Sequence, residues 1–232
     1  TLEDVKERGK LIAGVKTDFP PFGFLDKKGV NRGFDIDMAK ALSKELFGNE
    51  EAVEFVPVTT ENRIAFLTSN KIDIIVATLT ITEERKKKID FSIPYFISGQ
   101  LILVQGESKI TKYQDLAGKK VATIRGSVGD IAIREMVPDA ERIQFERNME
   151  ALQALKERRV DAFVQDFILL FNLLQKNRGL KMASLQPFRP GRYGLAVRKG
   201  DREWLDFINA TLTKMKETGE SKKLLDKWFG PE

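Results

Sequence analysis

The spacing of hydrophobic and polar positions changes along the chain between a strand-like and a helix-like pattern. Short runs rich in β-branched residues have the pattern of buried strands, and the longer stretches between them carry apolar residues at helical spacing. The predicted strands span residues 11–15, 53–58, 72–76, 101–104, 121–124, 160–164 and 195–197. The predicted helices span residues 35–46, 62–68, 128–135, 149–157, 167–177 and 204–217. Strands that alternate with helices in this way indicate an α/β fold with largely parallel sheets.

Two stretches of the chain have the character of domain boundaries. One lies near residues 95–99, after the turn at Pro94, and the other is QPFRPGR at residues 186–192. Both are compatible with extended strands that cross between lobes, and 232 residues suffice for two modest domains. We therefore predict a discontinuous first lobe of residues 1–96 plus 190–232 and a second lobe of residues 97–189.

The composition excludes several kinds of chemistry. The chain contains no cysteine and no histidine, which excludes disulfides, thiolate nucleophiles, the usual zinc sites and Ser-His-Asp triads. We accordingly expect no metal and no other cofactor. No apolar run reaches the roughly 18 residues of a membrane span. The chain opens on the polar segment TLEDVKERGK without a visible signal peptide, so if the protein is exported, this sequence is its mature or a shortened form.

The charge of the chain is moderately basic, with 39 Lys and Arg against 34 Asp and Glu and a net charge of +5. A basic surface can bind nucleic acid or anionic membranes. Here the cations alternate with acids, as in EERKKK at residues 83–88, which is typical of solvated helix faces. We expect no nucleic-acid partner.

A series of motifs occurs in one order along the whole chain, and together they are specific although each alone is weak. They are GVKTDFPPFGF (14–24), GFDIDMAKAL (33–42), ENRIAFL (61–67), KIDIIVATLTITEERKKKIDFSIPY (71–95), DLAGKKVATIRGS (115–127), RRVDAFVQD (158–166) and KWFG (227–230). Through these motifs the chain resembles the amino-acid-binding family of ABC-transporter periplasmic solute-binding proteins, known as family 3.

The resemblance implies a fold, a ligand and a partner. The fold is the two-lobed periplasmic-binding-protein fold of type II, with two α/β domains joined by two crossover strands. The ligand is one free L-amino acid, bound when the lobes close about a hinge. The partner is an ABC permease in the membrane, and the receptor is expected to be a monomer in the periplasm or on the extracytoplasmic face.

The central motif predicts a site for the ligand's α-carboxylate. Thr82 has the position of a helix N-cap, which places Arg85 in the first turn of the helix. In the resembling family this arginine clamps the α-carboxylate, while groups that match Thr78 and Thr80 hold the amino-acid backbone. Taken without the resemblance, Arg85 would more simply pair with a neighbouring surface acid such as Asp90.

The second lobe is expected to supply the counter-charge. The resemblance assigns Asp166 to the ligand's α-ammonium group, although an aspartate at this place can also serve as a helix N-cap. Ser127 ends a strand and opens a helix, so it is a candidate donor to the ligand. The family carries hydroxyls at two successive positions here, and this chain has Ser127 and then Val128, which removes one expected donor. Gln100 lies near the first crossover and could reach either the ligand or only the hinge.

Residue identities in the first lobe favour an acidic ligand. Lys16 and Arg63 match positions where glutamate and aspartate receptors carry cations for the side-chain carboxylate, and Phe19 would line the ligand's methylenes. Receptors for cationic amino acids carry an acid in place of Lys16 and an aromatic residue near Thr60, and this chain has neither. We therefore expect glutamate or aspartate. Asp18 could neutralise Lys16, which would suit glutamine or asparagine instead. The alternative ligand is accordingly a polar or cationic amino acid, such as glutamine or arginine.

Each of these candidates also has an ordinary structural interpretation. Lys16 could be a solvated loop lysine, Arg63 could pair with Glu61 on a helix surface, and Phe19 could be simple core. An enzyme on the same fold is a further alternative, because some relatives are cyclohexadienyl dehydratases. Those enzymes carry a lysine near Gln100 and a glutamate near Leu169. This chain has neither residue, so we predict that the protein is not an enzyme. A sensor domain is a third alternative, and the ending KWFGPE favours the freestanding receptor.

Overall fold

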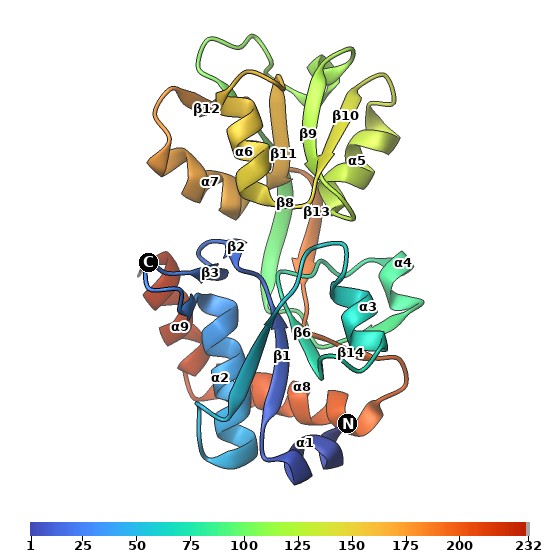
Figure 1. Ribbon diagram of the computed structural model, residues 1–232, viewed down its shortest axis with the longest axis vertical. Coiled ribbons are helices and arrows are strands. Elements are labelled where there is room, and N and C mark those ends of the chain that lie inside the picture. The colour runs from blue at the N-terminus through green and yellow to red at the C-terminus, as the bar shows by residue number, and fades with distance from the viewer. Residues whose placement is uncertain (231–232) are drawn as a thin grey trace. The chain divides into compact units, whose positions relative to one another are not determined.

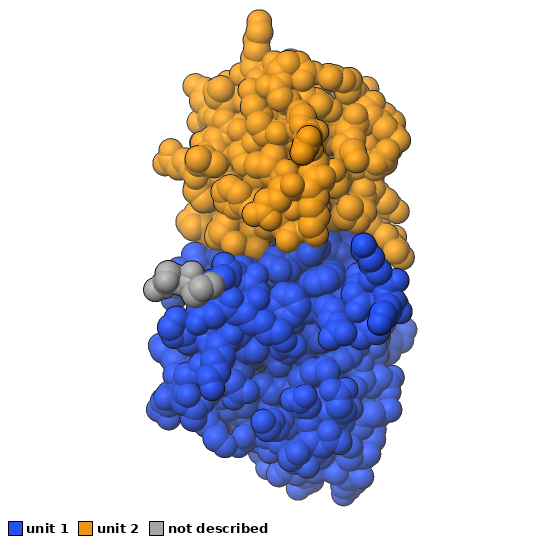
Figure 2. All heavy atoms as spheres, turned by 90° about the vertical axis from the view of Figure 1, so that its left-hand side faces the viewer, with its two compact units in different colours: residues 1–58, 62–97, 192–232 blue, residues 59–61, 98–191 orange. Residues whose placement is uncertain are grey.

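The computed structural model describes residues 1–230, which divide into two compact units. Unit 1 comprises Thr1–Val58, Asn62–Ile97 and Arg192–Glu232, of which residues 231–232 lie outside the described part. Unit 2 comprises Thr59–Glu61 and Ser98–Gly191, and Figure 2 colours the two units separately. The prediction places Thr59–Glu61 in the first lobe, together with the residues on either side, because no feature of the local sequence distinguishes this segment.

Unit 1 is built on a sheet of order β5-β1-β6-β14-β7. Strands β5 (Val53–Pro57), β1 (Leu11–Val15) and β6 (Ile74–Val76) are parallel. Strand β14 (Ala196–Arg198) runs antiparallel to β6 and to β7 (Ile89–Phe91). A small second sheet contains β2 (Asp18–Phe19), β3 (Gly23–Leu25) and β4 (Asn31–Arg32). The strands predicted from the β-branched runs are confirmed, with small shifts at their ends.

The helices of unit 1 follow from amphipathic stretches of the sequence, and Figure 1 shows them around its sheet. They are α1 (Leu2–Arg8), α2 (Phe34–Phe47), α3 (Arg63–Thr68), α4 (Glu83–Lys86), α8 (Arg202–Glu217) and α9 (Glu220–Phe229). In α2, Ile36, Ala39 and Leu42 lie one helical turn apart and are at most 1% exposed. Gly48 then ends the helix in the left-handed conformation that glycine adopts without steric cost.

Unit 2 is built on a sheet of order β10-β9-β11-β8-β12. Strands β10 (Glu141–Phe145), β9 (Lys120–Ile124) and β11 (Ala162–Asp166) are parallel, while β8 (Phe96–Gln105) runs antiparallel to β11. Strand β12 (Leu180–Met182) is antiparallel to β8, and β13 (Phe188–Tyr193) also pairs with β8. The remaining elements are η1 (Tyr113–Leu116), α5 (Val128–Met136), α6 (Asn148–Lys156) and α7 (Phe167–Lys176). The unit boundaries at 97/98 and 191/192 fall within β8 and β13.

An aromatic cluster in unit 1 joins segments that are far apart in the sequence. Phe22 is fully buried, and its ring centroid lies 5.7 Å from Phe34, 5.0 Å from Phe96 and 5.4 Å from Tyr193, each in an edge-on arrangement. The ring of Phe229 at the end of α9 lies 5.4 Å from Phe22. Edge-to-face aromatic pairs add to the hydrophobic stabilisation, so this cluster ties α9 and the start of α2 together.

In both units, polar residues follow the carboxyl ends of parallel strands. Lys16 follows β1 and Thr78 lies two residues after β6 in unit 1. Asp166 ends β11 and Ser127 follows β9 in unit 2. Open α/β sheets bind their ligands outside the carboxyl ends of their strands, so these edges are where a functional site is expected.

Candidate functional site

Arg85 is held by the turn that precedes it. Its backbone N–H donates to the Thr82 hydroxyl oxygen at 3.2 Å, which confirms the predicted N-cap of α4. Its guanidinium Nη1 donates to the Thr80 carbonyl oxygen at 2.7 Å, and the side chain is buried. The guanidinium is thereby fixed next to the loop that carries Thr78 and Thr80, and a guanidinium has five N–H donors in all.

The acids around Arg85 are engaged by lysines. Glu83 pairs with Lys86 at 2.8 Å, and Glu84 pairs with Lys87 at 2.9 Å. Asp90 pairs with Lys199 at 2.7 Å. Each acid that could pair with Arg85 at the surface thus has a lysine partner.

Arg63 and Thr78 meet at one peptide group. Arg63 begins α3 and is 3% exposed, and its Nη1 donates to the Ala77 carbonyl oxygen at 2.6 Å. The N–H of the same peptide group, that of Thr78, donates to Oδ2 of Asp35 at 3.0 Å. Thr78 has a φ of 45°, a left-handed conformation that is costly for a β-branched residue and therefore depends on these surroundings.

Asp35 is a buried carboxylate at the start of α2. Its Oδ1 accepts a hydrogen bond from the Tyr95 hydroxyl at 2.8 Å, and its side chain is fully buried. Burial raises the pKa of Asp35 from 3.8 to about 6, although the hydrogen bonds from Tyr95 and Thr78 and the charge of Arg63 oppose the rise. The pKa of Tyr95 is raised well above its ordinary value, mainly by burial and also by the neighbouring Asp35 carboxylate.

Lys16 is buried next to an aromatic ring. It is 2% exposed, and its Nζ lies 5.8 Å from the centroid of the Phe19 ring, within cation–π range. The structure therefore contradicts a solvated loop lysine. Phe19 is itself buried and packs edge-on against Phe22 at 6.1 Å, so it is part of the core as well as a neighbour of Lys16. Asp18 is half-buried two residues from Lys16.

Ser127 in unit 2 is the N-cap of α5. Its hydroxyl oxygen accepts the backbone N–H of Asp130 at 3.0 Å, and its own O–H proton can still be donated. The Asp130 carboxylate accepts from the Thr123 hydroxyl at 2.6 Å, from Arg142 at 2.6 Å and from Gln144 at 2.8 Å. This network fixes the first turn of α5 and with it the position of Ser127.

Asp166 occupies the N-cap position of α7 but makes no capping hydrogen bond with its side chain. Its Oδ1 instead accepts from the Gln100 amide at 2.6 Å, and the two residues are register partners on β11 and β8. The Asp166 backbone N–H donates to Gln165, whose amide nitrogen in turn donates to Asn148 at 2.7 Å. The hydrogen bond from Gln100 on the neighbouring strand thus orients the Asp166 carboxylate, and the side chain does not cap α7.

The sequence analysis misses Asp35 as part of this arrangement and leaves the role of Gln100 open. Asp35 has the sequence environment of an ordinary first-turn acid, and only its complete burial reveals a different role. Gln100 was left open, because its partner Asp166 is distant in the chain and is brought close by the pairing of β8 with β11. An acid within an otherwise apolar helix face, as in GFDIDMAKAL, is the signal that could have pointed to Asp35.

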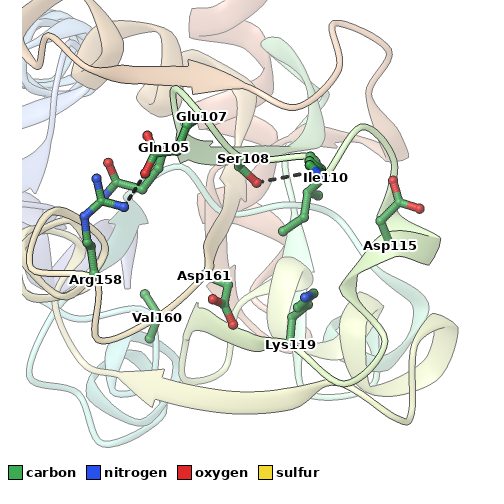
Figure 3. A pocket seen from close by; sticks show the side chains of 10 residues that line it. Gln105, Glu107, Ser108, Ile110, Asp115, Lys119, Arg158, Val160 and Asp161 are labelled. Carbon is green, nitrogen blue, oxygen red and sulfur yellow. Dashed lines mark hydrogen bonds and ion pairs between the residues drawn. The ribbon is translucent and has the colours of Figure 1, made fainter.

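A cavity of about 430 Å³ lies in unit 2 at a different edge of its sheet. It is lined by residues at and after the end of β8 and by residues that precede β9 and β11, whereas Ser127 and Asp166 lie at the opposite ends of β9 and β11. Figure 3 shows Arg158 and Glu107 directed toward each other at this cavity, where they form an ion pair. Asp161, which also lines it, accepts the Lys120 backbone N–H at 2.8 Å. This cavity is separate from the candidate residues.

Within residues 1–230, no group of three or more His, Cys, Asp or Glu side chains is placed to hold a metal ion. None of the helices in this part of the chain combines the length and the apolar character needed to cross a membrane.

The comparison with protein families decides the membership of the chain. The model of the bacterial extracellular solute-binding proteins, family 3, matches residues 11–231. The chain belongs to this family. It is accordingly an amino-acid-binding solute receptor of ABC importers, and it has the two-lobed type II periplasmic-binding-protein fold.

Three similar proteins illustrate the range of ligands within the family. The chain is 41% identical to the ABC transporter glutamine-binding protein of Bacillus subtilis, over 99% of this chain and 84% of the relative. It is 42% identical to the structure of an ancestral arginine-binding protein bound to glutamine, with a TM-score of 0.91 over 97% of this chain and 99% of the other. It is 39% identical to the arginine-bound form of truncated ArgBP from T. maritima, with a TM-score of 0.87 over 92% and 99%.

Proposed function

We propose that this receptor binds L-glutamine. The sequence interpretation favours glutamate or aspartate on the strength of Lys16 and Arg63. Similarity supports the alternative better, because the similar proteins described above bind glutamine or arginine. The observation that carries the proposal is that Arg63 is linked to the buried acid Asp35 through the Ala77–Thr78 peptide group, and that its charge opposes the rise in the pKa of Asp35 that burial causes. A cation that is already offset by an anion attracts a second carboxylate less strongly.

The residues that we propose for ligand binding come from both units. In unit 1, Arg85 with Thr78 and Thr80 would hold the α-carboxylate and backbone of the ligand. Lys16, Phe19 and Arg63 would surround its side chain. A glutamine amide suits this second group, because it can accept from a cation and donate to an acid such as Asp18. The residues proposed for the ligand in unit 2 are Ser127 and Asp166.

Arginine is the second candidate ligand. It is supported by the arginine-bound structure of the T. maritima relative. Against it stand Lys16 and Arg63, which are both buried and both cationic. Placing a third cation, the ligand's guanidinium, beside them would be unfavourable unless further acids offset the charge.

We further infer how the receptor works. It closes on its ligand about a hinge, acts as a monomer outside the cytoplasm, and presents the ligand to an ABC permease. It acts without catalysis, because a dehydratase would need charged residues at the places of Gln100 and Leu169. Gln100 is neutral and hydrogen-bonded to Asp166, and Leu169 is fully buried.

The proposal is tested by the thermal stability of ligand-stripped protein in the presence of each of the twenty amino acids. A ligand that binds only the folded state raises the unfolding temperature according to its affinity. We expect the largest increase with glutamine. A larger increase with arginine or glutamate would overturn the choice of ligand, and no increase with any amino acid would overturn the site.

A further inference from the structure

The carboxylate of Asp35 and the guanidinium of Arg63 are connected through one peptide group. Arg63 donates to the carbonyl oxygen of Ala77 at 2.6 Å, and the Thr78 N–H of the same group donates to Asp35 at 3.0 Å. The peptide dipole is therefore aligned between the anion and the cation, and each hydrogen bond polarises the other. All four residues belong to unit 1.

We propose that Asp35 is a specificity-determining residue, which offsets the charge of Arg63 and so makes the receptor favour a neutral ligand side chain over a carboxylate. This inference rests on the proposed function, because it takes Arg63 to face the ligand's side chain. Asp35 acts through Arg63 and Thr78 and is in this sense a positioning residue.

The surroundings of Asp35 allow its charge to change with pH. The titratable and charged groups that act on it are Tyr95 and Arg63, and Tyr95 is itself influenced by Tyr193. Burial raises the pKa of Asp35 to about 6, whereas the side chain of free glutamate titrates at about 4.3. Lowering the pH from 8 to 5 therefore protonates Asp35 while a glutamate ligand stays ionised, which leaves the charge of Arg63 without its offset.

The test is the ratio of the dissociation constants for glutamate and glutamine, measured by titration calorimetry on refolded protein. Asp35→Asn keeps an acceptor for the Thr78 N–H and removes the charge. We expect this variant to lower the glutamate-to-glutamine ratio at pH 8 by about tenfold. In the parent protein the ratio should fall similarly between pH 8 and pH 5, and in Asp35→Asn it should not change with pH.

Tyr95→Phe is the matched control, because it removes one hydrogen bond to Asp35 and leaves the carboxylate charged at pH 8. It should leave the ratio at pH 8 unchanged. If Asp35→Asn weakens both ligands equally, or if the parent ratio is independent of pH, Asp35 has only a structural role and the inference is wrong.

The design separates this inference from the choice of ligand. If the parent protein binds arginine and not glutamine, the proposed function fails. Asp35→Asn should then still weaken arginine by about tenfold relative to Tyr95→Phe, because it makes the site more positive. Equal arginine affinities for the two variants would overturn the inference in that case.

Discussion

At the scale of single residues, the candidate site is a set of charges that are fixed by backbone carbonyl groups. Arg85 is fastened to the Thr80 carbonyl oxygen and Arg63 to the Ala77 carbonyl oxygen. Both side chains are therefore held before any ligand arrives, which lowers the entropy lost on binding. The two arginines differ in their acidic neighbours, since Asp35 acts on Arg63 while lysines engage the acids around Arg85.

Replacement of Arg85 by alanine should abolish most of the affinity for any amino acid. The variant would leave the ligand's α-carboxylate without its guanidinium partner, at a cost of about 2–5 kcal/mol in binding free energy. Titration calorimetry of the parent and the variant measures this loss. Lys87→Ala, which removes an exposed cation of the same helical segment, serves as the control and should bind like the parent. Equal affinities for Arg85→Ala and Lys87→Ala would contradict the assignment.

Asp35 should also make stability depend on pH. Its pKa is raised from 3.8 to about 6 on folding, so the folded state binds the proton more tightly than the unfolded state. The stability gained from this proton is present below about pH 4 and is lost as the pH rises through about 6. For a shift of this size the loss is on the order of 3 kcal/mol.

Urea denaturation of the parent and Asp35→Asn across this range measures the effect. As the pH rises from about 4 to about 7, the parent should lose unfolding free energy relative to Asp35→Asn. Parallel pH profiles would show that the raised pKa of Asp35 is wrong.

At the scale of elements, the entry of the chain into α2 positions Asp35. The N–H groups of Phe34 and Asp35 donate to the carbonyl oxygens of Pro21 and Phe22, each at 2.9 Å. This close approach depends on Gly33, which has a φ of 133°. A Cβ atom at this position would collide with the Phe22 carbonyl group.

Gly33→Ala should therefore destabilise unit 1 and displace the start of α2. We expect a loss of about 2–3 kcal/mol in unfolding free energy, because both the backbone conformation and the space require glycine. Gly29→Ala is the matched control, since Gly29 has a φ of 75° with open space around its Cβ position. It should cost about 1 kcal/mol. Equal losses in chemical denaturation would contradict the close approach at Gly33.

The elements also show what the sequence could and could not predict. Strands such as Leu11–Val15 and helices such as Phe34–Phe47 follow from periodic apolar residues, because one face of each packs on a core. The sheet of β2, β3 and β4 was not predicted, since strands of two or three residues are too short to display a period. The Thr82 cap was predicted because its hydrogen bond is local. The contacts of Arg63 and Gln100 depend on segments that only tertiary packing brings together.

At the scale of the whole molecule, family membership rests on motifs that extend along nearly all of the chain. Our proposed choice of ligand rests on far fewer residues, chiefly Lys16, Arg63 and Asp35. This difference explains why the sequence sufficed for the receptor class but favoured an acidic ligand. The sequence displays the cations Lys16 and Arg63 within two of these motifs, whereas the opposing charge of Asp35 becomes apparent only when its burial is known.

The central claim is most directly tested by titration calorimetry of refolded, ligand-stripped protein with glutamine and then with glutamate at pH 8. We expect one glutamine per chain and an affinity for glutamine at least tenfold higher than for glutamate, a difference of about 1.4 kcal/mol. Tighter binding of glutamate would overturn the choice of glutamine, because it would mean that the charges of Lys16 and Arg63 prevail over that of Asp35.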